Sequence, residues 1–149
     1  MKSLAENKKA FHEYEILETF EAGISLNGQE VKSIRLGRAQ LQGSFVIISN
    51  ERPVLLNSEI PAYQPKNAPK DYNSSRTRPL LLNKKEIAHL IGKSAQKGLT
   101  LVPLRLYTRQ GNIKLEIGIA KNKSKADKRH VLKKRDIARD IQRELKERG

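Results

Sequence analysis

The pattern of apolar and polar positions predicts a chain built mainly of β-strands. Residues 113–119 alternate strictly between apolar and polar side chains, as expected for a strand with one face buried. Residues 99–107 alternate as well, but the phase changes at Val102 and Pro103. Proline cannot donate a hydrogen bond to a neighbouring strand, so a bulge or a sheet edge there would explain the change. A loop over 108–112 joins these two strands as a hairpin.

Further strands are expected in the first half of the chain. The apolar runs 44–49 and 53–56 are separated by residues 50–52 and predict a second hairpin. Residues 12–20 predict a fifth strand, and 23–26 a short sixth segment. The pattern therefore predicts about six short strands.

Two helices carry matching signals at their N-termini. Asn83 is followed three residues later by Glu86, which is the pattern of a capping box, and Asn27 with Glu30 repeats it. Apolar residues at helical spacing follow each cap. The expected left-handed ends of the two helices are Gly37 and Gly98. With no strand–helix–strand crossover in view, the sequence predicts a small antiparallel barrel or a strongly curled sheet.

The charge and composition divide the chain into a body and a tail. The 149 residues carry a formal net charge of +14 and no cysteine, which excludes a disulfide scaffold and a cysteine zinc site. Half of the excess charge lies in residues 121–149. We therefore expect a domain over residues 1–120 and a basic tail over 121–149 that is flexible when unbound. The polar N-terminus lacks the apolar stretch of a signal peptide, so we expect a cytoplasmic protein.

The tail has a helical pattern in its second half. Ile137, Ile141 and Leu145 recur every fourth residue and predict a narrow apolar stripe. A basic stripe with the same spacing consists of Arg135, Arg139 and Arg143. The like charges of these arginines repel one another in the isolated helix, and phosphates would neutralise them. We therefore expect a helix that becomes ordered when the tail binds a polyanion. A membrane-surface helix is the alternative, which the thin stripe without Phe or Trp disfavours.

Residues 61–79 form a long connection with four prolines, Tyr63 and Tyr72. Connections of this length without secondary structure are usually functional or disordered. One interpretation is a solvated connector. The other is an RNA-facing arm in which Arg76 and Arg78 meet phosphates and the tyrosines offer stacking faces.

Residues suited to catalysis are scattered along the chain. The three histidines lie in unrelated segments without metal-ligand spacing, and there is no glycine-rich phosphate loop or nucleophile motif. The candidate carboxylates of a nuclease are Glu13, Glu15, Glu18 and Glu21. Alternation places Glu18 opposite the other three, which is typical of a strand with one solvated face. We expect no enzyme activity, no metal and no cofactor.

These residues together resemble small protein B, the SsrA-binding protein family of bacterial trans-translation. The resemblance covers nearly the whole chain, with its motifs in order and at fitting distances. The matching stretches are residues 7–10 with 12–14, 20–23, 28–35, 76–78 with 80–82, 98–107, and 117–121 followed by 127–129.

The resemblance implies an oligonucleotide-binding (OB-like) antiparallel barrel with two to three helices. It implies binding to the tRNA-like domain of transfer-messenger RNA and delivery of that RNA to stalled ribosomes. The tail would enter the vacant mRNA channel near the small-subunit decoding region and fold into a helix there. We expect a monomer that performs no covalent chemistry. A ribosomal-RNA-binding assembly protein is the alternative function.

The resemblance also implies particular contact residues. On the body the RNA contacts would be Asn7, Lys8, Glu21, Leu81 and Lys114. In the tail the ribosome-engaging residues would be Lys121, Lys123, Asp127, Lys128 and Arg129, to which the basic stripe adds Arg135, Arg139 and Arg143. Burial of Leu81 in the core at a strand end is an alternative role for that residue. Ser124, Ala126 and Pro79 depart from the usual family residues, which predicts slightly weaker electrostatics.

Overall fold

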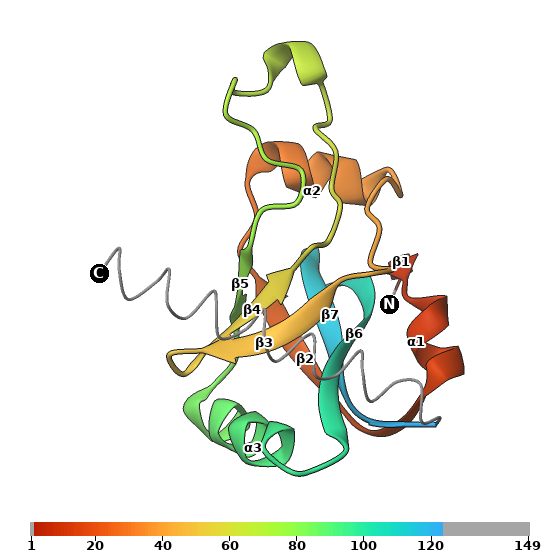
Figure 1. The fold of residues 1–149 in the computed structure, drawn as a ribbon. Helices are drawn as coiled ribbons and strands as arrows, with labels where there is room; N and C mark the ends of the chain where they lie inside the picture. The colour runs from red at the N-terminus through yellow and green to blue at the C-terminus, as the bar shows by residue number, and fades with distance from the viewer. Residues whose placement is uncertain (1, 124–149) are drawn as a thin grey trace.

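The computed structural model describes residues 2–123, which fold into seven strands, three α-helices and one short 3₁₀ helix (Figure 1). The elements are β1 (Lys2–Glu6), α1 (Lys8–Glu13), β2 (Tyr14–Ile24), α2 (Gly28–Arg35), β3 (Phe45–Ser49), β4 (Arg52–Leu56), η1 (Pro65–Asn67), β5 (Arg78–Leu81), α3 (Lys84–Ser94), β6 (Leu99–Arg109) and β7 (Asn112–Asn122). The predicted class, mainly β with helices, is confirmed.

All seven strands belong to one antiparallel sheet with the order β1-β6-β7-β2-β5-β4-β3. The sheet curls strongly, so that the edge strand β3 also lies close to β6 (Figure 1). Within the described residues no hydrogen-bonded pairing joins the two edge strands, β1 and β3, so the sheet is open. The expected barrel is thus a curled sheet of seven strands instead of about six.

Both predicted hairpins are present, with turns shorter than the sequence suggested. Asn50 and Glu51 connect β3 to β4, and Gln110 and Gly111 connect β6 to β7. All four residues have positive φ angles, between 51° and 79°. Two successive residues of this kind match the twist of the flanking strands, so each strand continues to the turn itself.

The segment before residue 27 differs from its prediction. Residues 12 and 13 end helix α1, and the expected strand 12–20 and segment 23–26 form one continuous strand, β2. The short elements β1, α1 and β5 are absent from the sequence-based prediction. Each spans only four to six residues, which is too short for a periodic pattern to emerge.

The two predicted helix caps are confirmed at atomic detail. In α2 the Asn27 side chain accepts from the Glu30 N–H while the Glu30 carboxylate accepts from the Asn27 N–H, and Asn83 with Glu86 does the same in α3. The predicted end of α2 is confirmed too, because Gly37 follows the C-cap Leu36 with a positive φ of 76° and its N–H donates to the Ile34 carbonyl. The end of α3 differs from its prediction, because this helix stops at Ser94. Gly98 has the expected positive φ of 83° but lies in the following turn.

Two β-bulges change which residues of β2 and β6 point to each face of the sheet. The register of β2 against β7 shifts between Ile16 and Glu18, and that of β6 shifts between Pro103 and Arg105. The second shift confirms the predicted bulge near Pro103. The first was not expected, and it places Glu15 and Glu21 on opposite faces, so the predicted shared face of these glutamates is wrong.

Gly118 of β7 lies where the two bulges meet. A Cβ atom at this position would stand 3.0 Å from Leu104 Cδ1 and 3.3 Å from Ile16 Cγ2. Leu104 is the extra residue of the β6 bulge, and its side chain crosses the glycine. A larger residue at this point of the sheet would therefore require the side chains of Leu104 and Ile16 to shift.

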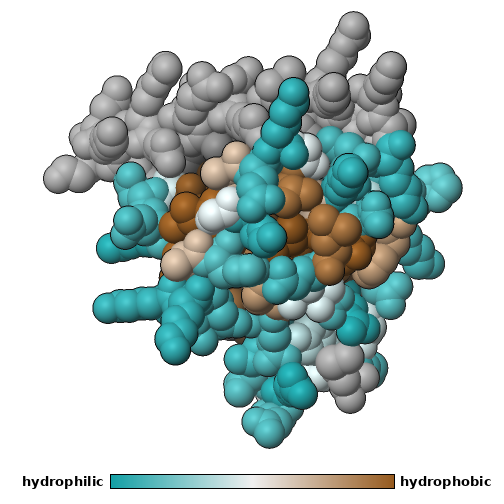
Figure 2. Space-filling view, turned by 90° about the horizontal axis from the view of Figure 1, so that it is seen from below, coloured by the Kyte–Doolittle hydropathy of each residue, from teal (hydrophilic) through white to brown (hydrophobic). Residues whose placement is uncertain are grey.

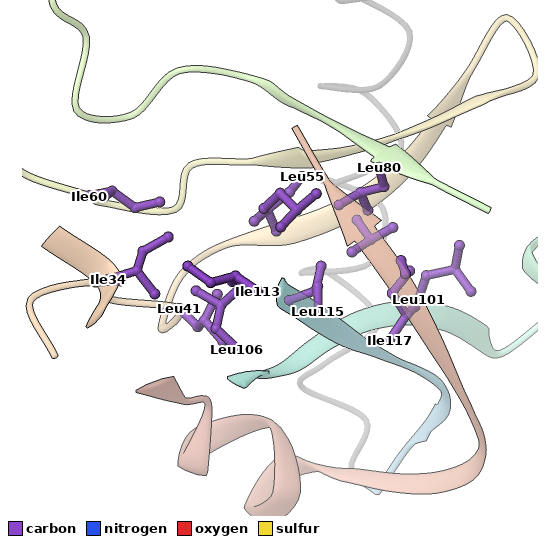
Figure 3. Packing of buried hydrophobic residues seen from close by; sticks show 14 of the residues in the cluster. Ile34, Leu41, Leu55, Ile60, Leu80, Leu101, Leu106, Ile113, Leu115 and Ile117 are labelled. Atoms are coloured by element: carbon purple, nitrogen blue, oxygen red, sulfur yellow. The ribbon is translucent and has the colours of Figure 1, made fainter. Parts of the chain in front are cut away.

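The main core fills the concave side of the curled sheet (Figure 3). Alternate residues of β7 point into it, together with side chains from α2, α3 and the β3–β4 hairpin. Its labelled members in Figure 3 are Ile34, Leu41, Leu55, Ile60, Leu80, Leu101, Leu106, Ile113, Leu115 and Ile117. A second cluster lies on the convex side, where Ala10 and Tyr14 pack against Val102, Leu104 and Ala120. On the end of the molecule opposite η1, apolar side chains reach the surface between hydrophilic ones (Figure 2).

Glu30 links the cap of α2 to the strand β5. Its carboxylate accepts from Arg78 Nε at 2.6 Å and from Arg76 Nη2 at 2.7 Å, and the side chains of both Glu30 and Arg78 are completely buried. Arg78 also donates to the carbonyls of Ser58, Ser74 and Arg76. Burial of the carboxylate raises its pKa, but the hydrogen bonds from Arg76 and Asn27 and the charge of Arg78 outweigh this effect and lower it.

This cluster corrects one part of the prediction for residues 61–79, the phosphate contact of Arg78. Arg78 is not exposed to phosphates, because a buried carboxylate needs a buried cation beside it. Arg76 donates to Glu30 and to the Ser25 carbonyl, but its side chain is 35% exposed, so phosphate contact by Arg76 stays a prediction. The connection is an ordered arm that projects past α2 at the top of Figure 1, held by a hydrogen bond from the Tyr72 hydroxyl to the Ile60 carbonyl.

Replacing Glu30 with Gln should show how much this cluster contributes to the free energy of unfolding. Gln preserves the cap of α2 but leaves the buried charge of Arg78 without its partner, so Glu30→Gln should lower the free energy of unfolding by about 3–5 kcal/mol. Urea denaturation at neutral pH measures this loss.

Glu86→Gln is the matched control, because Glu86 makes the same cap on α3 and has no ion pair among residues 2–123. It should change the stability by less than about 0.5 kcal/mol. The folded pKa of Glu30 lies below its ordinary 4.5, so its contribution is present above that pH and disappears as the pH falls through the lower folded value. The difference between wild type and Glu30→Gln should therefore shrink in acid, and equal losses in the two variants would contradict this assignment.

Candidate RNA-binding surface

The convex face of the sheet presents two adjacent rows of residues that include three of the predicted RNA contacts. One row crosses four strands, with Tyr107 of β6 opposite Lys114, Lys114 opposite Gly23, and Gly23 opposite Leu81 of β5. The neighbouring row consists of Arg105, Glu116 and Glu21. Residues directly opposite one another share a face of the sheet. Three predicted contacts, Glu21, Leu81 and Lys114, are therefore brought together on one surface.

Glu21 is held by donors from β6. Its Oε2 atom accepts from the Tyr107 hydroxyl at 2.6 Å and from Arg109 Nη1 at 2.8 Å. The hydrogen bonds from Tyr107 and Arg109 lower the pKa of Glu21, and the positive charge of Lys114 acts in the same direction. The carboxylate is therefore ionised at neutral pH and can only accept hydrogen bonds.

Leu81 adds an apolar platform beside these charges. Its side chain is 65% exposed, so the alternative prediction that it belongs to the core is wrong. The reason is the pleat of β5, in which Leu80 points into the main core and Leu81 points outwards. Gly23 leaves room for it, since a Cβ atom there would lie 3.2 Å from Leu81 Cβ.

A hollow of about 310 Å³ adjoins this platform. Gly23, Leu81 and Lys114 line it on the sheet side, and Arg35 of α2 and Gly111 of the β6–β7 turn line it on the other. Arg35 donates to the Gly111 carbonyl at 2.9 Å and so fixes the turn against the helix. The surface thus offers a concave apolar contact with cations at its margin.

Helix α1 lies at the other end of the convex face, on the second cluster. Asn7 caps this helix by accepting from the Ala10 N–H, and its Nδ2 atom donates to the Pro103 carbonyl at 2.9 Å. Only 6% of Asn7 is exposed, so the structure gives its amide a positioning role at the cap. Lys8, the first residue of α1, is exposed. RNA contact by either residue remains a prediction.

The tail residues fall mostly outside the described range. Lys121 is exposed on β7, which continues to Asn122, past the expected boundary at 120. The Lys123 N–H donates to the Glu13 carbonyl. Asp127, Lys128, Arg129, Arg135, Arg139 and Arg143 lie outside residues 2–123.

Sequence reasoning missed three residues of this surface, Arg105, Tyr107 and Arg109. Arg105 pairs with Glu116 at 3.1 Å and lies 5.4 Å from the centre of the Tyr107 ring. The change of phase at Pro103 contained a signal for them, because it puts residues 105, 107 and 109 on one face. Their partnership with Glu21 depends on the register of β6, β7 and β2, which no local pattern reveals.

The combination suits a single-stranded or looped RNA. Arginine and lysine bind phosphate oxygens, and an apolar platform accepts an unstacked base. An ionised carboxylate repels phosphate but accepts hydrogen bonds from base amino groups and 2′-hydroxyls. None of the helices in the described part of the chain is long and apolar enough to cross a membrane.

Comparison with known proteins gives one consistent result. The family model for the SmpB protein matches residues 4–147. The SsrA-binding protein of Carboxydothermus hydrogenoformans is 50% identical over 147 residues, which cover 99% of this chain and 98% of that protein. The SsrA-binding protein of Halalkalibacterium halodurans is 48% identical over 148 residues, which cover 99% of this chain and 96% of that protein.

A solved structure shows the same fold. A chain from the structure described as "tmRNA-SmpB: a journey to the center of the bacterial ribosome" superimposes with a TM-score of 0.66 at 43% identity. The match covers 85% of this chain and 92% of that chain.

Removing the Tyr107 hydroxyl should change the ionisation of Glu21. Tyr107→Phe deletes the strongest influence that lowers this pKa, so the pKa of Glu21 should rise towards its ordinary value. Carboxyl-detected NMR titration of the full chain measures the change. Tyr72→Phe is the control, because its hydroxyl donates to Ile60 in the arm instead. An unchanged Glu21 in Tyr107→Phe, or an equal rise in both variants, would rule out this hydrogen bond as the cause.

Proposed function

Because the chain belongs to the SmpB family, we propose that it binds the tRNA-like domain of transfer-messenger RNA and delivers that RNA to stalled ribosomes. Its relatives carry the name SsrA-binding protein, and the similar solved structure is described as a tmRNA–SmpB complex on the bacterial ribosome. Both names point to the same RNA and the same destination.

The single observation that carries this proposal is the row from Tyr107 to Leu81 on the convex face. Together with Glu21 of the neighbouring row, it places a cation, an ionised acceptor and an exposed apolar side chain on one surface. A surface made only of lysine and arginine would bind any polyanion. The carboxylate of Glu21 and the platform of Leu81 instead favour RNA with unpaired bases and accessible 2′-hydroxyls.

We assign the two parts of the chain different tasks. The body over residues 1–120 binds the tRNA-like domain, and the segment 121–149 occupies the empty mRNA channel of the ribosome. The division is supported by the charge, half of whose excess lies in the last fifth of the sequence. The basic residues of that segment meet ribosomal RNA phosphates near the decoding region.

The protein acts in this proposal by binding alone, as a cytoplasmic monomer. Neither covalent chemistry nor a cofactor is part of it. Binding of ribosomal RNA by an assembly protein is the other function compatible with a basic surface, but the names of the relatives do not favour it.

Binding specificity tests the function directly. The protein should shift transfer-messenger RNA in a native gel at a lower concentration than an unrelated structured RNA of equal length. Only transfer-messenger RNA contains the tRNA-like domain that the body is proposed to bind. Equal affinity for both RNAs would favour a general ribosomal-RNA binder. Cleavage of either RNA after incubation with magnesium would point to a nuclease and overturn the proposal.

The salt dependence of binding tests the role of Lys114. If Lys114 neutralises one phosphate, Lys114→Ala should reduce the slope of log K against log salt by about 0.7–0.9. Lys85→Ala is the matched control, since Lys85 is an exposed lysine of α3, away from both rows, and its slope should equal that of the wild type. The same reduction in both variants would mean that Lys114 acts only through the net charge.

A further inference from the structure

Helix α2 and the arm over residues 61–79 form a surface with an excess of positive charge. Residues 28–38 and 61–76 contain only one exposed carboxylate, Asp71, because Glu30 is buried. Their exposed cations, which we call the α2–arm ridge, are Lys32, Arg35, Arg38, Lys66 and Lys70. Within residues 2–123 none of these five side chains forms an ion pair with a carboxylate. Their charge is therefore available to a partner.

The arm is fastened to α2 by three polar contacts. The Gln29 side-chain oxygen accepts from the Gln64 N–H at 2.9 Å, and Arg38 Nη1 donates to the Tyr63 carbonyl at 3.3 Å. Lys32 Nζ lies 5.5 Å from the centre of the Tyr63 ring. Backbone hydrogen bonds also close successive turns within the arm. The ridge is thus formed before a partner arrives, so binding orders few groups and loses little entropy.

The α2–arm ridge joins the candidate RNA-binding surface at Arg35. This residue lines the hollow that Lys114 lines from the sheet side. Lys32 lies one turn earlier in α2 and on the same side of the helix. The cations therefore continue from the convex face over α2 and onto the arm, which projects beyond the helix (Figure 1).

The ridge and the convex face differ in chemistry. On the convex face Glu21 accepts hydrogen bonds and Leu81 offers an apolar platform, which suits unpaired nucleotides. Lysine and arginine are donors only. Donors of this kind bind phosphate oxygens, which carry no information about the base. Double-stranded RNA is recognised mainly in this way, through its backbone and its shape.

We propose that the α2–arm ridge binds the sugar–phosphate backbone of a base-paired stem of the tRNA-like domain, next to the unpaired loop held on the convex face. This inference rests on the proposed function and names the form of RNA that the protein recognises, a junction between a loop and a stem. The arm reaches the RNA through Lys66 and Lys70, whereas Arg78 is buried.

The salt dependence of binding to two simple RNAs tests the ridge. The probes are a short blunt-ended RNA duplex and single-stranded oligouridine, and the variant is the full chain with Lys66→Ala and Lys70→Ala. If each lysine neutralises one phosphate, the slope of log K against log salt should fall by about 1.4–1.8 for the duplex. The slope for oligouridine should stay at the wild-type value, because unpaired nucleotides bind on the convex face.

The matched control is the full chain with Lys84→Ala and Lys97→Ala. Both lysines are exposed and lie in or just after α3, at the opposite end of the body from the arm (Figure 1). This variant loses the same net charge but should keep the wild-type slope for the duplex. An equal reduction in the two variants, or an unchanged duplex slope in the arm variant, would overturn the proposal.

Directed cleavage locates the stem on the tRNA-like domain itself. The protein contains no cysteine, so an iron chelate that releases hydroxyl radicals can be attached to one introduced thiol. Ala68→Cys places it between Lys66 and Lys70, and the exposed Ala95 at the end of α3 gives the control Ala95→Cys. The first label should cleave base-paired nucleotides that the second leaves intact. Cleavage confined to unpaired nucleotides, or the same pattern from both labels, would contradict binding of a stem by the ridge.

The outcome for the ridge can be separated from the outcome for the proposed function. If wild type binds transfer-messenger RNA no better than an unrelated structured RNA, the proposed function fails, while a reduced duplex slope in the arm variant still supports the ridge. Preference for transfer-messenger RNA with an unchanged duplex slope keeps the function and overturns the ridge.

Discussion

The buried carboxylate of Glu30 is the interaction on which the rest of the architecture depends. It completes the cap of α2 and compensates the charges of Arg76 and Arg78, so one side chain joins a helix, a strand and the base of the arm. A buried ion pair is weak evidence for stability when its charges are poorly satisfied. Here Arg78 also donates to three carbonyl oxygens. The pair therefore fixes geometry: it determines where β5 begins.

The position of β5 in turn creates the candidate RNA-binding surface. Because Arg78 and Leu80 point inwards, the pleat turns Pro79 and Leu81 outwards. Leu81 then meets Gly23 on β2 and joins the row that ends at Tyr107. Arg78, which the sequence suggested as a phosphate contact, thus acts one step earlier, by orienting the strand that carries the exposed Leu81. Phosphate contact by Arg76 stays a prediction.

The sequence predicted those features of the fold that depend only on residues close together in the chain. The caps at Asn27 and Asn83, both hairpins and the bulge near Pro103 follow from residue types and spacing alone. The bulge at Leu17 and the burial of Arg78 could not be predicted, since each depends on a partner far along the chain. The resemblance to a family gave Glu21, Leu81 and Lys114 as RNA contacts, which stays a prediction. That the three share one surface, and that Glu21 has hydrogen-bonding partners on β6, required the register of the strands.

The two bulges determine which side chains of the central strands point to each face of the sheet. Strand β7 runs without a shift, while β2 and β6 each carry one extra residue beside it, at Leu17 and Leu104. Removing Leu17 would exchange the two faces for every residue of β2 on one side of the deletion, and Tyr14 would leave the cluster beneath α1. An insertion of one residue would exchange the two faces in the same way. Related chains can therefore vary in length at the arm or in the turns, but within these strands a change of one residue needs a second change that restores the phase.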